Sequence, residues 1–119
     1  MLKFHKTEKG IKIAELIPGS EDVSGPDDLL DIMADAGYHD SNRIVIHEES
    51  LPEDFFDLRT GLAGEILQKF SNYRVRLAVV GDFTEIESKS LRDFIRESNN
   101  RRIINFVKSL QEALSRLGS

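Results

Sequence analysis

The stretch from residue 55 to residue 83 constrains the fold more than any other part of the chain. Its second half is a nearly continuous apolar run over residues 75–80 that ends at Gly81-Asp82. A run of this kind is typical of a strand that is covered on both faces. Its first half has apolar residues at the spacing of one helical face, namely Leu58, Leu62, Ala63, Ile66, Leu67 and Phe70. The stretch therefore predicts a helix from Leu58, a stop at Ser71-Asn72 and a buried strand.

Two glycines, Gly61 and Gly64, fall inside this predicted helix. Each glycine in a helix costs about 1 kcal/mol relative to alanine, so another interaction should offset the loss. We expect close packing of the helix against the sheet, because a contact of that kind leaves no room for a side chain. The alternative is that the backbone approaches a bound anion or a partner near the start of the helix.

Strands and helices alternate along the rest of the chain. The first predicted elements are a hairpin with arms Leu2–Thr7 and Ile11–Ile17 around Gly10, and a helix from Pro26 that stops at Gly37. A strand over Arg43–His47 comes before the central stretch. After it come a helix that is capped by Ser88 or Ser90 and ends at Asn99-Asn100, a strand over Ile103–Val107, and a last helix that begins with the capping box Ser109–Glu112. Alternation of this kind implies crossover connections between parallel strands. We therefore expect one α/β domain over residues 1–119, with a mixed sheet in which the hairpin is antiparallel and the strands from Arg43, Arg74 and Ile103 are parallel.

The composition limits the kind of partner and chemistry. The formal charge of −5 and the pI of about 5.2 argue against nucleic-acid binding, which favours a basic face. The absence of cysteine excludes disulfides, thiolate catalysis and cysteine-ligated zinc. No apolar run has the length of a membrane span, and the first residues lack a signal-peptide core. We therefore expect a cytoplasmic protein that contacts neither membrane nor nucleic acid.

The segment FFDLRTGLAGEILQKFSNYRVRLAVVGDF, followed by SKSLRDFIRESN, resembles a bacterial family of uncharacterised single-domain proteins, domain-of-unknown-function family 4180. The resemblance extends from the hairpin to Leu117 and is most specific in the central third. It implies no established activity.

A more distant resemblance is to STAS domains, the sulfate-transporter and anti-sigma-factor-antagonist fold. Arg59-Thr60-Gly61-Leu62 stands where those domains have Ser-Ser-Gly-Leu at the start of a helix, and residues 103–114 are similar to their final strand, serine and helix. The resemblance implies a STAS-like sheet and a regulatory, protein-binding role. Two departures bear on the phosphorylation switch of such proteins: Arg59 replaces the first serine, and Asp57 is one place too early if Thr60 is the phosphate acceptor.

The candidate site lies at the carboxyl ends of the strands, where open α/β sheets bind their ligands. Our first choice is a partner-binding or anion-binding surface made of Asp57, Arg59, Thr60, Gly61 and Asp82. It belongs to the hypothesis of a non-enzymatic regulatory or interaction module with a protein partner. A third, structural hypothesis is a homodimer built on an exposed strand or helix face.

The alternative is a small acid–base or cation-dependent enzyme that uses His47, Glu48 and Asp82. It requires these side chains to converge in the fold. No fixed-spacing motif supports it, and the three histidines have no metal-ligand spacing. We therefore expect no metal, no cofactor and no catalytic residue.

Overall fold

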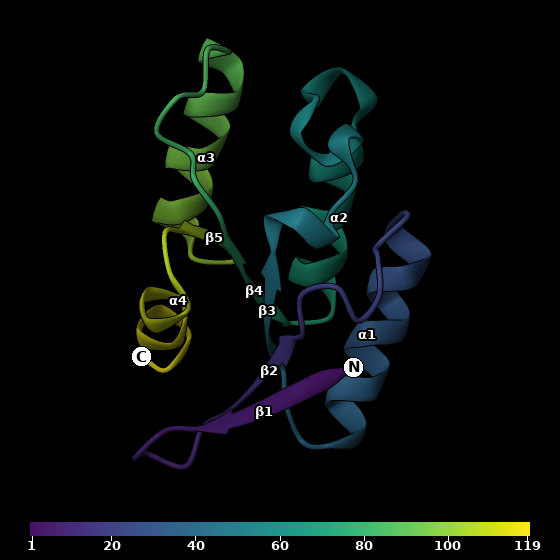
Figure 1. Ribbon diagram of the computed structural model, residues 1–119, viewed down its shortest axis with the longest axis vertical. Coiled ribbons are helices and arrows are strands. Elements are labelled where there is room, and N and C mark those ends of the chain that lie inside the picture. The colour runs from purple at the N-terminus through teal and green to yellow at the C-terminus, as the bar shows by residue number, and fades with distance from the viewer.

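The computed structural model describes residues 1–119 and contains one five-stranded sheet with the strand order β1-β2-β3-β4-β5 (Figure 1). Strands β1 (Leu2–Lys6) and β2 (Lys12–Leu16) pair as an antiparallel hairpin. Strands β3 (Arg43–His47), β4 (Arg76–Val80) and β5 (Ile104–Val107) run parallel to β2 and to one another. The predicted α/β class, the hairpin and the parallel strands are therefore confirmed.

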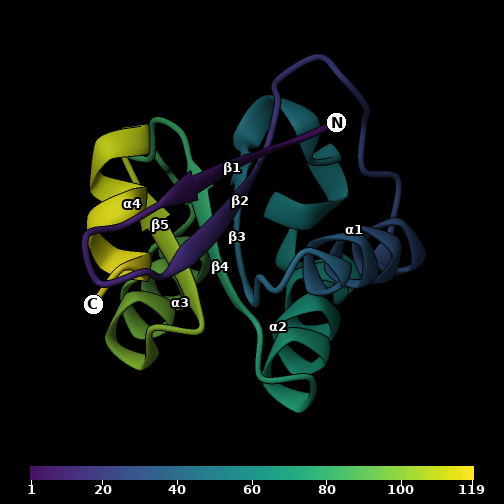
Figure 2. The ribbon, with the colours of Figure 1, turned by 90° about the horizontal axis from the view of Figure 1, so that it is seen from below.

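Four helices cover this sheet: α1 (Pro26–Tyr38), α2 (Leu62–Asn72), α3 (Lys89–Arg101) and α4 (Leu110–Leu117). In Figure 2, α1 and α2 lie together on one side of the sheet and α4 on the other, while α3 runs beside β5. None of the helices combines the length and the apolar character that crossing a membrane requires.

Two cores lie on the two faces of the sheet. The larger contains 19 buried residues, among them Phe70 from α2, and is extended by half-buried Phe94 and Ile95 from α3. The smaller contains six, namely Ile13, Val45, Ala78, Val107, Ala113 and Leu117. Because neighbouring residues of a strand point to opposite faces, Leu77 and Val79 enter the larger core and Ala78 the smaller. This confirms that β4 is covered on both faces.

The start of the central helix was predicted wrongly. Helix α2 begins at Leu62, and the residues before it form two short 3₁₀ turns, Glu53–Phe56 and Leu58–Thr60. Gly61 is not inside the helix: it precedes α2 with a φ of 75°, in the left-handed region that favours glycine. Gly64 does lie inside α2, but a Cβ built there would have no atom within 4 Å. Close packing therefore explains neither glycine.

Two other helix ends were placed too early. Helix α1 continues through Gly37 to Tyr38, and α3 continues through Asn99 to Arg101. The side chain of Asn99 binds the edge strand β5 instead of ending α3, since its Oδ1 accepts a 2.7 Å hydrogen bond from the N–H of Phe106. The predicted helix starts are better, because Ser88 caps α3 and Ser109 caps α4 through side-chain oxygens that accept backbone N–H groups.

Candidate functional site

The turn Asp57–Gly61 stands on a cluster of phenylalanines. The 3₁₀ turn before it buries Phe55 in the larger core, where its ring centroid lies 6.2 Å from that of Phe106. The neighbouring ring of Phe56 lies 5.0 Å from Phe55 and 6.1 Å from Phe83. These contacts attach the turn firmly to the carboxyl-end edge of the sheet.

The hydroxyl of Thr60 holds the turn together. It lies 2.7 Å from the carbonyl oxygen of Asp54 and 2.8 Å from that of Asp57, and it accepts a hydrogen bond from the N–H of Leu62 at 3.2 Å. Gly61 follows in the left-handed conformation and allows α2 to begin. The hydroxyl that the STAS resemblance compares with a phosphate acceptor is therefore bonded within its own turn.

Asp57 and Arg59 form an ion pair on the surface of this turn. The guanidinium donates to both carboxylate oxygens, at 3.0 and 2.9 Å, and the Arg59 N–H also donates to Asp57. The side-chain hydrogen bond from Arg59 lowers the pKa of Asp57, and the same bond raises the pKa of Arg59. The Arg59 side chain is 90% exposed, so a partner can reach it.

A cavity of about 620 Å³ adjoins this pair. It lies between the turn and the start of α3, and its lining includes Phe56, Asp57, Arg59, Ser88 and Ser90. The Oγ of Ser88 accepts from the N–H of Leu91, so this hydroxyl is a helix cap. The cavity therefore offers an aromatic ring, an ion pair and the capped start of a helix.

Asp82 lies at the same edge of the sheet but has a separate set of contacts. Its carboxylate accepts from both the N–H and the hydroxyl of Thr84, at 3.0 and 2.7 Å, and these bonds lower its pKa. Glu48 folds over the backbone of the same loop, because a Cβ built on Gly81 would meet its Cδ at 2.6 Å. Gly81 thus makes room for the Glu48 side chain.

His47 does not join Glu48 and Asp82. Its Nε2 is 2.7 Å from Oε2 of Glu15, and His5 lies 2.9 Å from the other oxygen of the same carboxylate. The three side chains come from β3, β2 and β1, and Glu15 is 5% exposed. Burial alone would raise the pKa of Glu15, but the hydrogen bonds with His47 and His5 outweigh it and hold the pKa below its usual value.

Little in the sequence indicates this His5–Glu15–His47 cluster. The one available signal was a charged residue, Glu15, at a strand position between apolar neighbours. Such a position needs a partner when it is buried. The two histidines bind different oxygens of Glu15, so the cluster is a hydrogen-bonded row, and no three His, Asp or Glu side chains of the chain are placed to share a metal ion.

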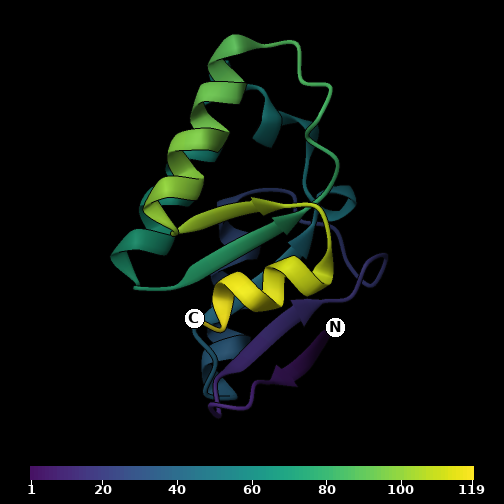
Figure 3. The same cartoon turned by 90° about the vertical axis from the view of Figure 1, so that its left-hand side faces the viewer.

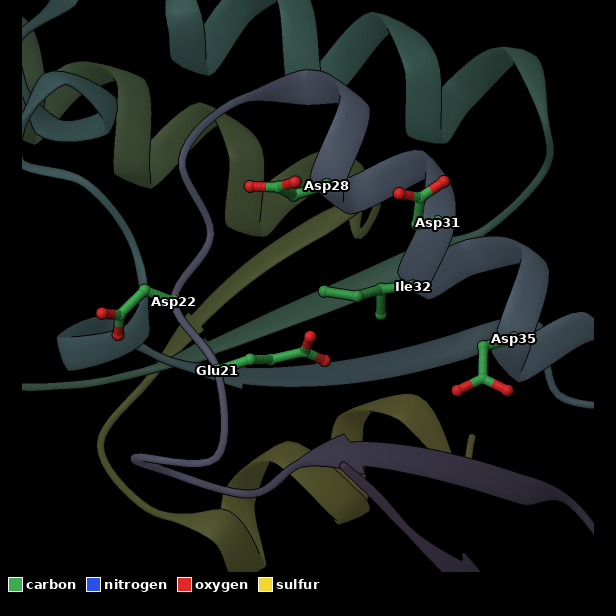
Figure 4. Close-up of a pocket in the computed structure, with 6 residues that line it drawn as sticks. All are labelled: Glu21, Asp22, Asp28, Asp31, Ile32 and Asp35. Atoms are coloured by element: carbon green, nitrogen blue, oxygen red, sulfur yellow. The ribbon is translucent and has the colours of Figure 1, made fainter.

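An acidic hollow beside α1 was also missed. Its volume is about 190 Å³, and its lining comprises Glu21, Asp22, Asp28, Asp31, Ile32 and Asp35. In Figure 4 the carboxylates come from the loop before α1 and from successive turns of α1, and they spread along the hollow without meeting at one point. The hollow gives the chain a strongly acidic flank.

The family model described as "Domain of unknown function (DUF4180)" matches residues 8–117. The match begins in the hairpin turn and ends with α4, so it includes the turn Asp57–Gly61 and the loop at Asp82. A search of curated proteins finds no match to the chain.

Proposed function

The chain belongs to the DUF4180 family, and we propose that it is a non-enzymatic regulatory or interaction module of STAS-like type. It binds a partner protein through the surface formed by the turn Asp57–Gly61 and the neighbouring loop at Asp82. The hairpin, the alternating parallel strands and the C-terminal helix follow the order that the STAS resemblance implies, which supports the proposal.

The observation that carries the proposal is a rigid turn that displays a charged group beside an open cavity. The side chains of Thr60 and Asp57 make hydrogen bonds to other groups of the same turn, while the guanidinium of Arg59 stays exposed. A surface that is already ordered loses less conformational entropy when it binds. Arginine is also enriched among the residues that dominate interface energies.

The enzyme alternative has less support. It needs His47 beside Glu48 or Asp82, whereas His47 is bound to Glu15 and Asp82 to Thr84. The His47–Glu15 pair is its one favourable feature, because a carboxylate can orient an imidazole that acts as a base. Both histidines of the row direct Nε2 at Glu15, which leaves only Nδ1 of each for a substrate.

The test is a quantitative pull-down from the native host with wild type, Arg59→Glu and Thr60→Glu. Thr60→Ser, which keeps the hydroxyl, and Lys3→Gln, on the distant strand β1, are the controls. We expect one specific partner to be lost with both glutamate variants and kept with both controls, at unchanged thermal stability of Arg59→Glu. An unchanged partner list with Arg59→Glu would overturn the proposal.

A further inference from the structure

The arginines of the chain divide into two groups. Six of the nine donate hydrogen bonds within the chain, either to carboxylates or to backbone and amide oxygens, namely Arg43, Arg59, Arg76, Arg92, Arg96 and Arg116. The other three, Arg74, Arg101 and Arg102, are exposed, and their guanidinium groups have no hydrogen-bond or ion-pair partner. Arg74 and Arg102 belong to the turns that lead into β4 and β5, and Arg101 is the last residue of α3, directly before the second turn.

These two turns are neighbours at the amino-end edge of the sheet, opposite the candidate site. The side chain of Arg76 donates to the carbonyl oxygen of Arg102 at 3.0 Å, which joins the turn before β5 to the start of β4. Figure 3 shows both turns on the left of the sheet, away from the loop between β4 and α3 on the right. The three unbonded arginines therefore form one basic edge in a chain of net charge −5.

The backbone does not explain why arginine occupies these turns. Arg74 has a φ of 56° and Arg102 a φ of 62°, in the left-handed region that costs a residue with a Cβ about 1–2 kcal/mol. A cation near a helix C-terminus gains only about 0.3–1 kcal/mol when exposed. Glycine would suit both positions better as backbone, so the guanidinium groups need another explanation.

An apolar cleft lies on one side of the turn that carries Arg74. Its volume is about 460 Å³, and its lining includes Leu30, Met33, Tyr73 and Val75. Tyr73 is 64% exposed, and Tyr38, at the end of α1, is 85% exposed. They are the only two tyrosines of the chain, and both mark this edge of the sheet.

A smaller polar groove of about 200 Å³ lies on the other side of the same turn. Its lining includes Gly64, Gln68, Ser71, Asn72 and Arg101. Gly64 has no packing neighbour that would exclude a Cβ, and a side chain there would project into open space. The missing side chain of Gly64 therefore widens this groove.

We propose that this edge docks an acidic segment of a partner protein, with an apolar side chain of the segment in the cleft and its carboxylates on Arg74, Arg101 and Arg102. The charges are complementary, and exposed tyrosine beside arginine is typical of the energetic centre of an interface. A nucleic-acid backbone fits less well, because phosphate contacts to many basic side chains dominate that binding and the chain as a whole is acidic. This surface is distinct from the turn Asp57–Gly61, so an experiment can contradict the proposal for one surface and leave the other proposal standing.

The test is fluorescence polarisation with the full chain and synthetic peptides in which one leucine or phenylalanine is flanked by glutamates. Matched peptides carry glutamine in place of glutamate, or alanine in place of the anchor. We expect salt-sensitive binding of the acidic anchored peptide in the micromolar range, and binding at least about tenfold weaker, or about 1.4 kcal/mol, for both matched peptides.

The decisive variant is Arg74→Gly with Arg102→Gly, which removes two guanidinium groups and relieves two left-handed backbones. We expect it to lose at least about tenfold in peptide affinity while its thermal stability stays the same or rises. The control, Lys3→Gln with Lys89→Gln, removes the same charge from other exposed positions and should bind as wild type does.

Four results would overturn the proposal. The glutamine peptide could bind as well as the glutamate peptide, or the double glycine variant could keep full affinity. A single-stranded oligonucleotide could also bind more tightly than the peptide and depend on the same arginines. The remaining possibility is that a second copy of the chain occupies this edge through its acidic α1 flank. Sedimentation of the chain alone tests this possibility. Self-association that the double glycine variant abolishes would also overturn the proposal.

Discussion

The two faces of the sheet are held by different interactions. The face under α1 and α2 is a continuous apolar core that buries large side chains such as Phe55 and Phe70. The face under α4 has only six apolar core residues, and buried polar groups flank them. Glu15 with its two histidines lies toward one edge of the sheet and Asn105 toward the other. The first face is therefore specified by shape and volume, and the second largely by hydrogen bonds.

Asn105 is the centre of the second polar group. It is completely buried, and its Nδ2 donates to the carbonyl oxygens of Leu77 and Arg102 at 3.1 and 3.2 Å. Its Oδ1 accepts from Nε of Arg116 at 3.0 Å, and Arg116 also donates to the carbonyl oxygen of Asn99. One amide thus connects β4, β5, α3 and α4.

Phe70→Ala should break the apolar face and give the largest loss of stability. The side chain is completely buried, and truncation of such a phenylalanine costs about 3–5 kcal/mol through lost burial and a residual cavity. Chemical denaturation measures the change in unfolding free energy. Leu67→Ala, at a half-buried position of the same helix, is the control and should cost clearly less. Equal losses for the two variants would contradict the assignment of Phe70 to the core.

Asn105→Ala should break the polar face at a cost of about 2–3 kcal/mol. The change removes the hydrogen bond to the buried carbonyl oxygen of Leu77 and leaves Nε of Arg116 without its acceptor, while the carbonyl oxygen of Arg102 keeps its bond from Arg76. An unsatisfied buried group costs about 1–3 kcal/mol. Asn100→Ala, at an exposed position in the last turn of α3, should be nearly neutral. If denaturation finds Asn105→Ala as mild as Asn100→Ala, hydrogen bonds do not specify this face.

Glu15→Gln should reveal the polar face through the dependence of stability on pH. Because the folded pKa of Glu15 is lowered, its ionised form stabilises the fold above the ordinary glutamate pKa, and this contribution is lost as the pH falls through the folded pKa. Hydrogen bonds to a charged group contribute about 1.5–3 kcal/mol, so we expect a loss of about 2 kcal/mol at neutral pH.

The same variant should make the stability depend less steeply on pH in the acid range. In wild type the unfolded chain binds a proton at Glu15 at a higher pH than the folded chain does, and glutamine removes this difference. Denaturation midpoints measured from neutral to acid pH show this slope. Glu97→Gln, at an exposed position of α3, should leave it unchanged. A wild-type slope in Glu15→Gln would mean that the carboxylate is not held by the histidines.

What the sequence could predict follows the same division. Apolar periodicity located every strand and the order of the helices, because burial of apolar side chains determines both. It could not find the row His5–Glu15–His47, whose members are up to 42 positions apart and meet only through the pairing of three strands. It also placed Arg59 and Thr60 inside a helix, because the apolar spacing of Leu58 and Leu62 hides the left-handed residue between them.

The smallest effects test positions outside both faces, where backbone conformation alone should decide the outcome. Gly61→Ala should destabilise the fold by about 1–2 kcal/mol, because a φ of 75° is strained for any residue with a Cβ. Gly64→Ala should stabilise it by about 0.5–1 kcal/mol, because this helical position has open space around it. Thermal unfolding of the two variants should therefore show shifts of opposite sign for the same chemical change.

A loss of stability in Gly64→Ala would reveal a contact at this position that restores the packing explanation. A gain would mean that the native glycine is kept at the expense of stability, as expected if it serves the groove between α2 and Arg101.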